Sequence, residues 1–222
     1  MIAAGHQPNY LPWLGFFDKM RRADLFIIED NIQFERQGFI SRNRIMTTEG
    51  VRWLSVPIEH ANKPLLIKEA KIANKSAPRW KHKHWATLKH SYCKAPYWND
   101  YSGFFEETYE REWDHLIDLN MHLIDGIMGF LNIDKPLIWG SSLHAEGKKT
   151  ELLVAQCKQV DADIQLAGVG GKGYINRTLF EKEGIELIFQ EFTQPIYPQI
   201  MEGFVPNLSV VDYLFCTGGK PW

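Results

Sequence analysis

The chain has 222 residues, of which 45% are hydrophobic and 23% charged, so it can bury a sizeable core within one large domain. The formal net charge of −2 shows no basic excess, which argues against a nucleic-acid backbone as the main partner. The three cysteines are odd in number and none lies in a CxxC pair. A disulfide framework or a Cys-rich zinc site is therefore not expected.

Nothing in the sequence indicates a membrane protein or an exported one. No apolar run approaches the roughly 18 residues that a membrane span needs. The start of the chain, Met1 to His6, lacks the basic and apolar regions of a signal peptide. We therefore expect a cytoplasmic protein without a membrane span.

The first elements predict a parallel pair of strands. Met1 to Gly5 reads as a short buried strand, and Pro12 is well placed as the first residue of a helix that runs to Arg22. Leu25 to Glu29 is a second apolar run of strand length. This β-loop-α-β order favours parallel pairing.

The middle of the chain predicts an antiparallel hairpin and then helices. Thr47 to Gly50 is a turn signal between the two predicted strands of the hairpin, and a third strand is expected after it. Ser76 is the expected cap of the first helix. A broad apolar stripe at helical spacing predicts a long core helix after it. The predicted ranges are strands at 39–46, 51–58 and 65–73 and helices at 78–92 and 110–131.

The last third alternates between strands and helices, which implies a parallel sheet with right-handed crossovers. Strands are expected at 136–139, 164–167 and 185–189, and helices at 149–159, 176–183 and from Ser209 to about Phe215. Ser209 and Asp212 fit helix capping and a first-turn charge. The predicted fold is α/β, with a mixed, mainly parallel sheet flanked by helices, an antiparallel hairpin insertion and a helical segment in the middle. Residues 1–222 then form a single domain, in which residues 76–131 either make a helical lobe or cover the sheet.

The turn after the first strand is the leading candidate for a functional site. His6 follows a strand at the edge where open α/β sheets bind ligands, and histidine is a common acid or base near neutral pH. Gln7, Asn9 and Tyr10 add hydrogen-bonding groups, and Trp13 adds a flat face. The simpler alternative is a histidine that only hydrogen-bonds a loop.

Two polar residues follow the second strand. If the first two strands are adjacent and parallel, Asp30 emerges at the same edge as His6, where a carboxylate could orient an imidazole or bind a sugar hydroxyl. Gln33 lies three residues further on. The alternative is an aspartate that caps the loop.

Two basic segments are candidate anion sites. In Arg42-Asn43-Arg44, strand alternation places both arginines on one face, where two guanidinium groups suit a phosphate or pyrophosphate. Lys81 and His84 belong to a basic predicted helix that could meet a phosphate or an acidic carrier. The alternative for both segments is a solvated face.

A glycine-rich turn, Gly168 to Gly173, lies between a predicted strand and a predicted helix. Backbone N–H groups in such a turn can bind phosphate, although the turn matches neither the P-loop nor the full dinucleotide-binding motif. Gly173 and Tyr174 at its end join the candidate substrate-binding residues.

Several motifs together resemble the WbqC-like family, from one end of the chain to the other. They are His6 to Phe17, Arg42-Asn43-Arg44, Trp53 with Pro57, Lys81 with His84, Leu119-Asn120, Ser141-Ser142 and Phe204 to Phe215. Members of this family are associated with O-antigen and other surface-polysaccharide pathways, some with the addition of glycine-type acyl groups to amino sugars.

The resemblance implies an N-acyl or aminoacyl transferase that acts on a nucleotide-linked amino sugar. The acyl donor would be a coenzyme A or carrier-protein thioester, so an acyl or peptidyl carrier protein is an expected partner, and no tightly bound cofactor is expected. His6 would take the proton of the amine, Asp30 would orient His6, and Asn43 or backbone N–H groups would stabilise the oxyanion. Arg42 and Arg44 would hold a pyrophosphate or phosphopantetheine, and Tyr10 and Trp13 would stack on a base or sugar.

Two other functions stay open. The strand–histidine turn–helix–strand order also resembles nucleotidylyltransferases, but their tandem His-x-x-His is absent because His6 stands alone. The third alternative is a non-catalytic subunit that binds a sugar nucleotide or a carrier protein.

Overall fold

A computed structural model describes all 222 residues, and the chain divides into two compact units. The first, unit 1, comprises Met1–Gln7, Gly15–Asn31 and Asp134–Thr193. The second, unit 2, comprises Pro8–Leu14, Ile32–Ile133 and Gln194–Trp222. Each unit is therefore assembled from stretches that are far apart in the sequence. The expectation of a single domain stays a prediction.

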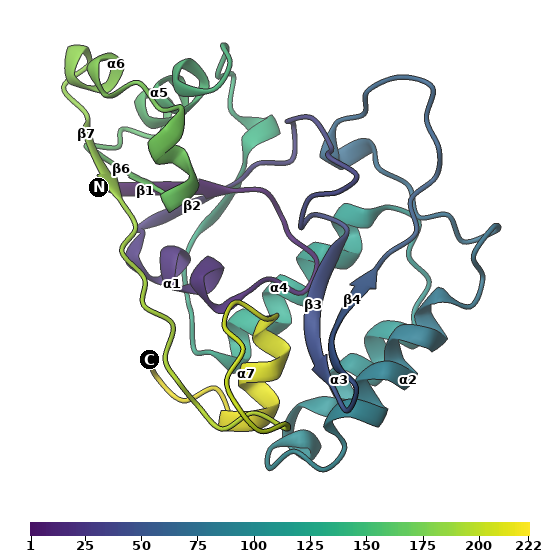
Figure 1. Ribbon diagram of the computed structural model, residues 1–222. Coiled ribbons are helices and arrows are strands. Elements are labelled where there is room, and N and C mark those ends of the chain that lie inside the picture. The colour runs from purple at the N-terminus through teal and green to yellow at the C-terminus, as the bar shows by residue number, and fades with distance from the viewer. The chain divides into compact units, whose positions relative to one another are not determined.

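Unit 1 contains a five-stranded, entirely parallel sheet in the order β5-β2-β1-β6-β7 (Figure 1). Unit 2 adds the two-stranded antiparallel sheet, so the predicted mixed α/β class is confirmed. The predicted pairing of the first two strands is also confirmed, with His6 opposite Ile28. The strands of unit 1 are β1 (Ile2–His6), β2 (Leu25–Ile28), β5 (Leu137–Trp139), β6 (Ile164–Ala167) and β7 (Glu186–Phe189).

Helices cover both faces of this sheet, as Figure 1 shows. On one face, Phe16 of α1 (Leu14–Arg22) packs edge-on against His6 and Phe26. On the other face, Ala3 belongs to a buried cluster with residues of α5 (Thr150–Gln159) and α6 (Arg177–Lys182). Since side chains alternate along a strand, Ala4 and His6 share the α1 face, whereas Ala3 and Gly5 share the α5 face.

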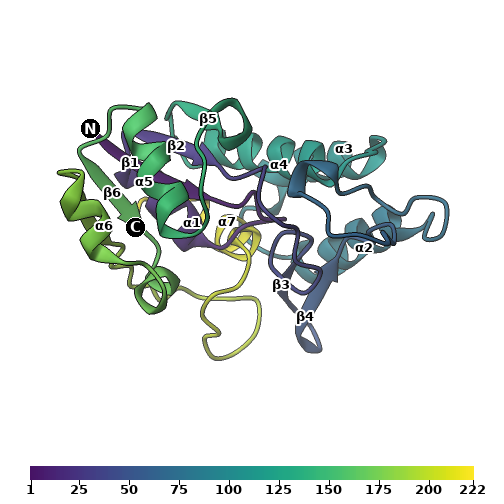
Figure 2. The ribbon, with the colours of Figure 1, turned by 90° about the horizontal axis from the view of Figure 1, so that it is seen from above.

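Unit 2 holds the predicted hairpin, formed by β3 (Arg42–Thr47) and β4 (Gly50–Ser55). Gly50 adopts a φ of 101°, which explains why glycine closes this tight turn. Figure 2 shows the hairpin beside α2 (Trp80–Tyr92). The expected third strand at 65–73 is wrong, because this segment contains a 3-10 helix at Ile67–Glu69 and forms only isolated bridges with other segments.

The predicted long helix at 110–131 is wrong at its start. In this range the structure has one helix, α4 (Leu116–Phe130), and an unpredicted helix, α3 (Trp98–Glu110), ends where the predicted one was to begin. The segment between them pairs with the chain near Ile72: the Ile72 N–H donates to the Asp114 carbonyl at 2.8 Å, and Lys71 forms a bridge with His115. These backbone hydrogen bonds replace those that a continuous helix would have made.

Of the two predicted helix caps, one is confirmed and the other is wrong. Ser209 caps α7 (Val210–Thr217) as expected, with its side chain accepting from the Val211 N–H at 3.3 Å. Ser76 does not cap α2, because its hydroxyl donates to the Ala73 carbonyl and Arg79 stands at the helix start. None of the helices is long and apolar enough to span a membrane.

A buried carboxylate organises the C-terminal part of unit 2. Asp212 is fully buried and accepts hydrogen bonds from the hydroxyls of Tyr92 and Tyr197, both at 2.8 Å, and from the Gln199 amide at 2.9 Å. The Tyr92 hydroxyl also accepts from the Met46 N–H at 3.0 Å. Asp212 therefore links α7, α2 and the hairpin, rather than acting only as a first-turn charge.

We expect Asp212→Ala to lower the free energy of unfolding by about 3 kcal/mol or more, because each buried donor left without an acceptor costs about 1–3 kcal/mol. Tyr197→Phe is the matched control and should cost about 1 kcal/mol, since it removes one hydrogen bond. Urea denaturation followed by circular dichroism measures both. Equal losses for the two variants would contradict the central role of Asp212.

Candidate functional site

The candidate functional site lies at the edge of the sheet formed by the carboxyl ends of β1 and β6. The strand order places β1 between β2 and β6, so the chain leaves β1 toward one side of the sheet and reaches β6 on the other. Such a reversal is the topological switch point at which open parallel α/β sheets bind ligands, beyond the carboxyl ends of the strands. His6 is the last residue of β1, so it lies at this edge.

The His6 imidazole is neutral and its tautomer is fixed. Its Nδ1 lies 2.9 Å from the Gln7 carbonyl oxygen, which can only accept, so Nδ1 carries the proton. The lone pair therefore resides on Nε2. Burial and the nearby charge of Lys19 lower the pKa of His6 to about 3.

A buried ammonium accompanies His6 at the edge. Lys19 of α1 is 3% exposed, and its Nζ donates to the Gly5 carbonyl at 2.7 Å. A methyl group placed on Gly168, just after β6, would lie 3.8 Å from the same Nζ. The ammonium thus lies at the switch point, and burial lowers its pKa to about 8, an effect that Glu29 partly opposes.

Asp30 lies at the expected edge, because β1 and β2 are adjacent and parallel. Its hydrogen-bond partner is not His6, however. The Asp30 carboxylate accepts from the Ser141 N–H at 2.7 Å and from the Ser141 hydroxyl at 2.6 Å. The structure therefore ties the end of β2 to the residues after β5 through Asp30, and it gives Asp30 no contact with which to orient His6.

The glycine-rich turn after β6 is a 3-10 helix, Val169–Gly173. The Gly171 N–H donates to the Gly168 carbonyl at 2.9 Å, and the Tyr174 N–H donates to the Gly171 carbonyl at 3.1 Å. These two amides are thus engaged within the turn. Gly173 and Tyr174 are exposed, Tyr174 at 57%, and their binding role stays a prediction.

The residues after Gln7 belong to unit 2, where they are anchored in its core. Asn9 is 4% exposed and Tyr10 is fully buried. The Tyr10 hydroxyl is hydrogen-bonded to His84 Nδ1 at 2.8 Å and to the Tyr109 hydroxyl. Tyr10 and His84, expected at a ligand, therefore have each other as partners, and burial lowers the pKa of His84 to about 4.

Two buried amides hold the same segment. The Asn43 amide donates to the Leu11 carbonyl at 2.7 Å and is 1% exposed, so the structure supports an anchoring role and not the expected oxyanion contact. Asn120 donates to the carbonyls of Pro8 and Ile40, both at 2.8 Å. Leu11 adopts a φ of 44°, a conformation that these contacts stabilise.

Trp13, expected at the His6 turn, and Gln33, expected after the second strand, are more accessible. Trp13 is half-buried and bridges Ser209, and Gln33 is exposed and bridges Leu66. Both lie in unit 2. Their substrate-binding roles stay predictions.

Arg42 and Arg44 share one face of β3, as predicted. Their guanidinium carbons lie 4.4 and 5.8 Å from the centre of the Trp53 ring, which is 45% exposed. Arg42 also donates to the Gln37 carbonyl, and Arg44 to the Asn207 carbonyl at 3.1 Å. The Nε atoms of both arginines are buried without a partner, so each guanidinium retains donor capacity. Anion binding by this pair stays a prediction.

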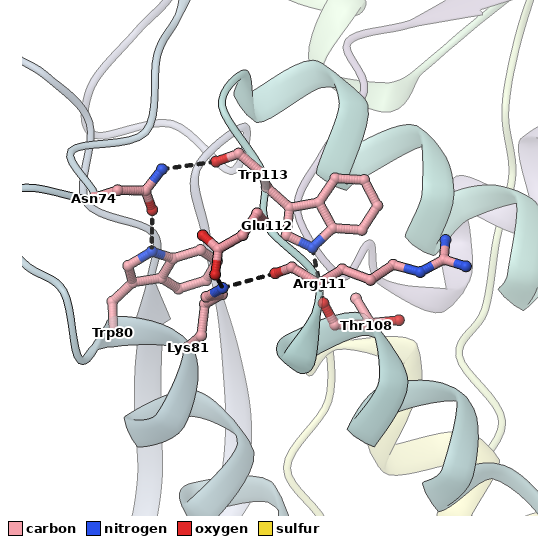
Figure 3. Close-up of polar contacts among 7 residues, drawn as sticks. All are labelled: Asn74, Trp80, Lys81, Thr108, Arg111, Glu112 and Trp113. Atoms are coloured by element: carbon pink, nitrogen blue, oxygen red, sulfur yellow. Dashed lines mark hydrogen bonds and ion pairs between the residues drawn. The ribbon is translucent and has the colours of Figure 1, made fainter.

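Lys81 lies in a different setting from the one expected, as Figure 3 shows. Its Nζ donates to the Arg111 carbonyl at 2.8 Å and pairs with the Glu112 carboxylate. Nearby, the Trp80 indole donates to Asn74 at 3.0 Å, and Asn74 donates to the Trp113 carbonyl at 2.8 Å. Lys81 therefore secures the segment between α3 and α4 to α2, and its ammonium already has a carboxylate partner.

Sequence reasoning missed several polar residues at the edge of unit 1. The sequence carries no signal for Lys19, because this residue lies in an otherwise ordinary amphipathic helix. Glu29 and Asn31 flank Asp30 in the run Glu29-Asp30-Asn31 directly after a buried strand, and this run of polar residues was the available signal. Gln156 of α5 gave no such signal, because only the fold brings its side chain to Glu29, at 3.0 Å.

The fold and this edge define an open parallel α/β protein with a polar, histidine-containing switch point. The chain belongs to the WbqC-like protein family, whose model matches residues 7–221. It is similar to the uncharacterized protein Rv1507c of Mycobacterium tuberculosis, with 31% identity over 217 residues that cover 96% of this chain and 93% of that protein. No solved structure matches the chain.

We expect His6 to remain the neutral Nδ1–H tautomer from pH 5 to pH 8, because its pKa is lowered to about 3 and Nδ1 is held by the Gln7 carbonyl. Long-range nitrogen–proton NMR spectra distinguish the two tautomers and the imidazolium, and His6→Gln assigns the signal. A His6 resonance that titrates within this range would contradict the burial of the ring.

The lowered pKa of Lys19 predicts that the free energy of unfolding rises at alkaline pH. Its pKa is about 8 when folded against an ordinary value of 10.5, so the unfolded chain binds more protons between these values. The unfolding free energy of the wild type should therefore rise relative to Lys19→Met from about pH 8 to pH 10.5, by at most about 3 kcal/mol. Denaturation of both proteins at several pH values measures the difference. A constant difference would contradict the lowered pKa.

Proposed function

We propose that the protein is an N-acyl or aminoacyl transferase with a nucleotide-linked amino sugar as acceptor, in surface-polysaccharide biosynthesis. The donor is a thioester of coenzyme A or of a carrier protein. The observation that carries the proposal is the state of His6: a neutral imidazole at the end of β1, with Nδ1 held by a carbonyl and the lone pair on Nε2. The chain belongs to the WbqC-like family, and the pathway class is proposed from the association of that family with surface polysaccharides.

In this reaction the amine nitrogen attacks the thioester carbonyl carbon, and the carbonyl electrons move to oxygen as the C–N bond forms. The new ammonium gives a proton to His6 Nε2. The oxyanion then re-forms the carbonyl, the C–S bond breaks, and the leaving thiolate takes the proton from His6. The products are an amide and a thiol.

Lys19 makes the basicity of His6 depend on the substrate. The charge of Lys19 is one cause of the low pKa of His6. An anionic nucleotide bound at the switch point would counter that charge and raise the proton affinity of the imidazole. Within unit 2, we also propose Arg42 and Arg44 as a site for a phosphate group, since each guanidinium retains donor capacity.

The test is acyl transfer from a glycyl or acetyl thioester to a nucleotide-linked amino sugar. We expect His6→Ala to reduce the rate by about 10²–10⁴-fold, the usual contribution of a general base. His82→Ala, which changes an exposed histidine of α2, is the control and should retain the wild-type rate. A wild-type rate in His6→Ala would remove His6 from the mechanism.

The same samples distinguish the other two functions. Release of pyrophosphate from a nucleoside triphosphate, without acyl transfer, would favour a nucleotidylyltransferase. Tight binding of the sugar nucleotide or carrier protein without turnover would favour a binding subunit.

A further inference from the structure

Three buried oxygen atoms in unit 1 have no hydrogen-bond donor. They are Glu29 Oε1, Asn31 Oδ1 and Gln156 Oε1. Leaving such an acceptor unpaired costs about 1–3 kcal/mol. Three unpaired acceptors therefore destabilise the fold, which a cluster with a purely structural role would not do. Native proteins contain few such atoms, and their concentration at one place calls for an explanation.

These atoms form one cluster, on the α5 face of the sheet. Gln156 Nε2 donates to Glu29 Oε2 at 3.0 Å. A methyl group placed on Gly140 would lie 2.9 Å from Asn31 Oδ1 and 3.3 Å from Glu29 Oε2. A methyl group on Gly5 would lie 2.7 Å from Glu29 Oε1. Two glycines thus make room for the carboxylate and amide, and Asn31, which is half-exposed, connects the cluster to the surface.

The chemistry of the cluster selects a ligand that donates hydrogen bonds. All three free atoms are acceptors, which excludes a phosphate or carboxylate as their partner. The charge of Glu29 is already partly countered by Lys19, since each side chain shifts the pKa of the other. A neutral donor therefore suits the cluster better than a metal cation, and hydroxyl groups are the simplest neutral donors.

The topology indicates which hydroxyl groups these are. Glu29 follows β2 directly, and β2 lies next to β1 on the side away from β6. In parallel sheets with a switch point of this kind, an acidic residue after the second strand hydrogen-bonds the ribose hydroxyl of a bound nucleotide. The unpaired oxygens of Glu29 and Asn31 lie at this same position, directly after β2.

We propose that Glu29 and Asn31 bind the ribose hydroxyl groups of a nucleotide, an assignment that rests on the proposed use of a nucleotide-linked substrate. Gln156 is a positioning residue, because its amide holds Glu29 Oε2 and leaves Oε1 for the ligand. Unit 1 then recognises the ribose of the substrate through these residues, apart from any role of His6.

The experiment compares ribonucleoside diphosphates with their 2′-deoxy counterparts by calorimetry, using the adenine, guanine, cytosine and uracil forms. The wild type should bind at least one ribonucleotide about tenfold or more tightly than its deoxy form, the equivalent of one hydrogen bond. Glu29→Gln and Asn31→Leu should reduce this ratio toward one, with little change in the affinity for the deoxy form.

Two further variants keep the result interpretable. Asn31→Asp retains an acceptor and should retain the ratio, and Asn99→Leu, an exposed change on α3, should leave it unaltered. Equal affinity of the wild type for the two forms, a ratio that persists in both Glu29→Gln and Asn31→Leu, or no binding of any diphosphate would each overturn the inference.

The outcome is separable from that of the proposed function. Loss of the ribose preference in the variants without any acyl transfer by the wild type would support the ribose site and reject the transferase. Acyl transfer by the wild type with no ribose preference would reject only the ribose site.

Discussion

The hydrogen bond from the Lys19 ammonium to the Gly5 carbonyl is the interaction on which the edge of unit 1 depends. It joins α1 to the end of the central strand β1 across a distance of 2.7 Å. It also places a buried positive charge at the topological switch point of the sheet. Burial of the neighbouring imidazole keeps His6 neutral, and this charge adds to the effect. The same charge opposes the rise in the Glu29 carboxyl pKa that burial causes.

Unit 2 is organised by polar groups of another kind. Its buried tyrosines, amides and aspartate have partners within the unit, and together they fix the segment after Gln7 and the start of α7. Many residues of the motifs that identify the family belong to this network. The motifs therefore report largely on a shared internal architecture, and a family signature is not by itself a map of the residues that contact substrate.

Sequence patterns were most successful where a local signal and the tertiary structure agree. The parallel strands were predictable from short apolar runs with helices between them, and the hairpin from its turn residues. The start of α4 was not, because backbone pairing of Asp114 and His115 with the residues near Ile72 keeps the segment before Leu116 outside the helix. Likewise, His6 and Asp30 were located correctly, but the Asp30–Ser141 and Glu29–Gln156 contacts join residues more than a hundred positions apart, which no local pattern encodes.

The order in which the chain builds its two units has a consequence for synthesis on the ribosome. β1 occupies the middle of its sheet, yet its neighbour β6 begins at Ile164, and unit 2 is completed only by the last segment of the chain. Neither unit can therefore close until most of the polypeptide has emerged. Pairings between such distant segments form slowly, and the partners already synthesised must wait with apolar surface exposed. The nascent protein is thus expected to depend on chaperones for longer than a chain of this length with sequentially paired elements.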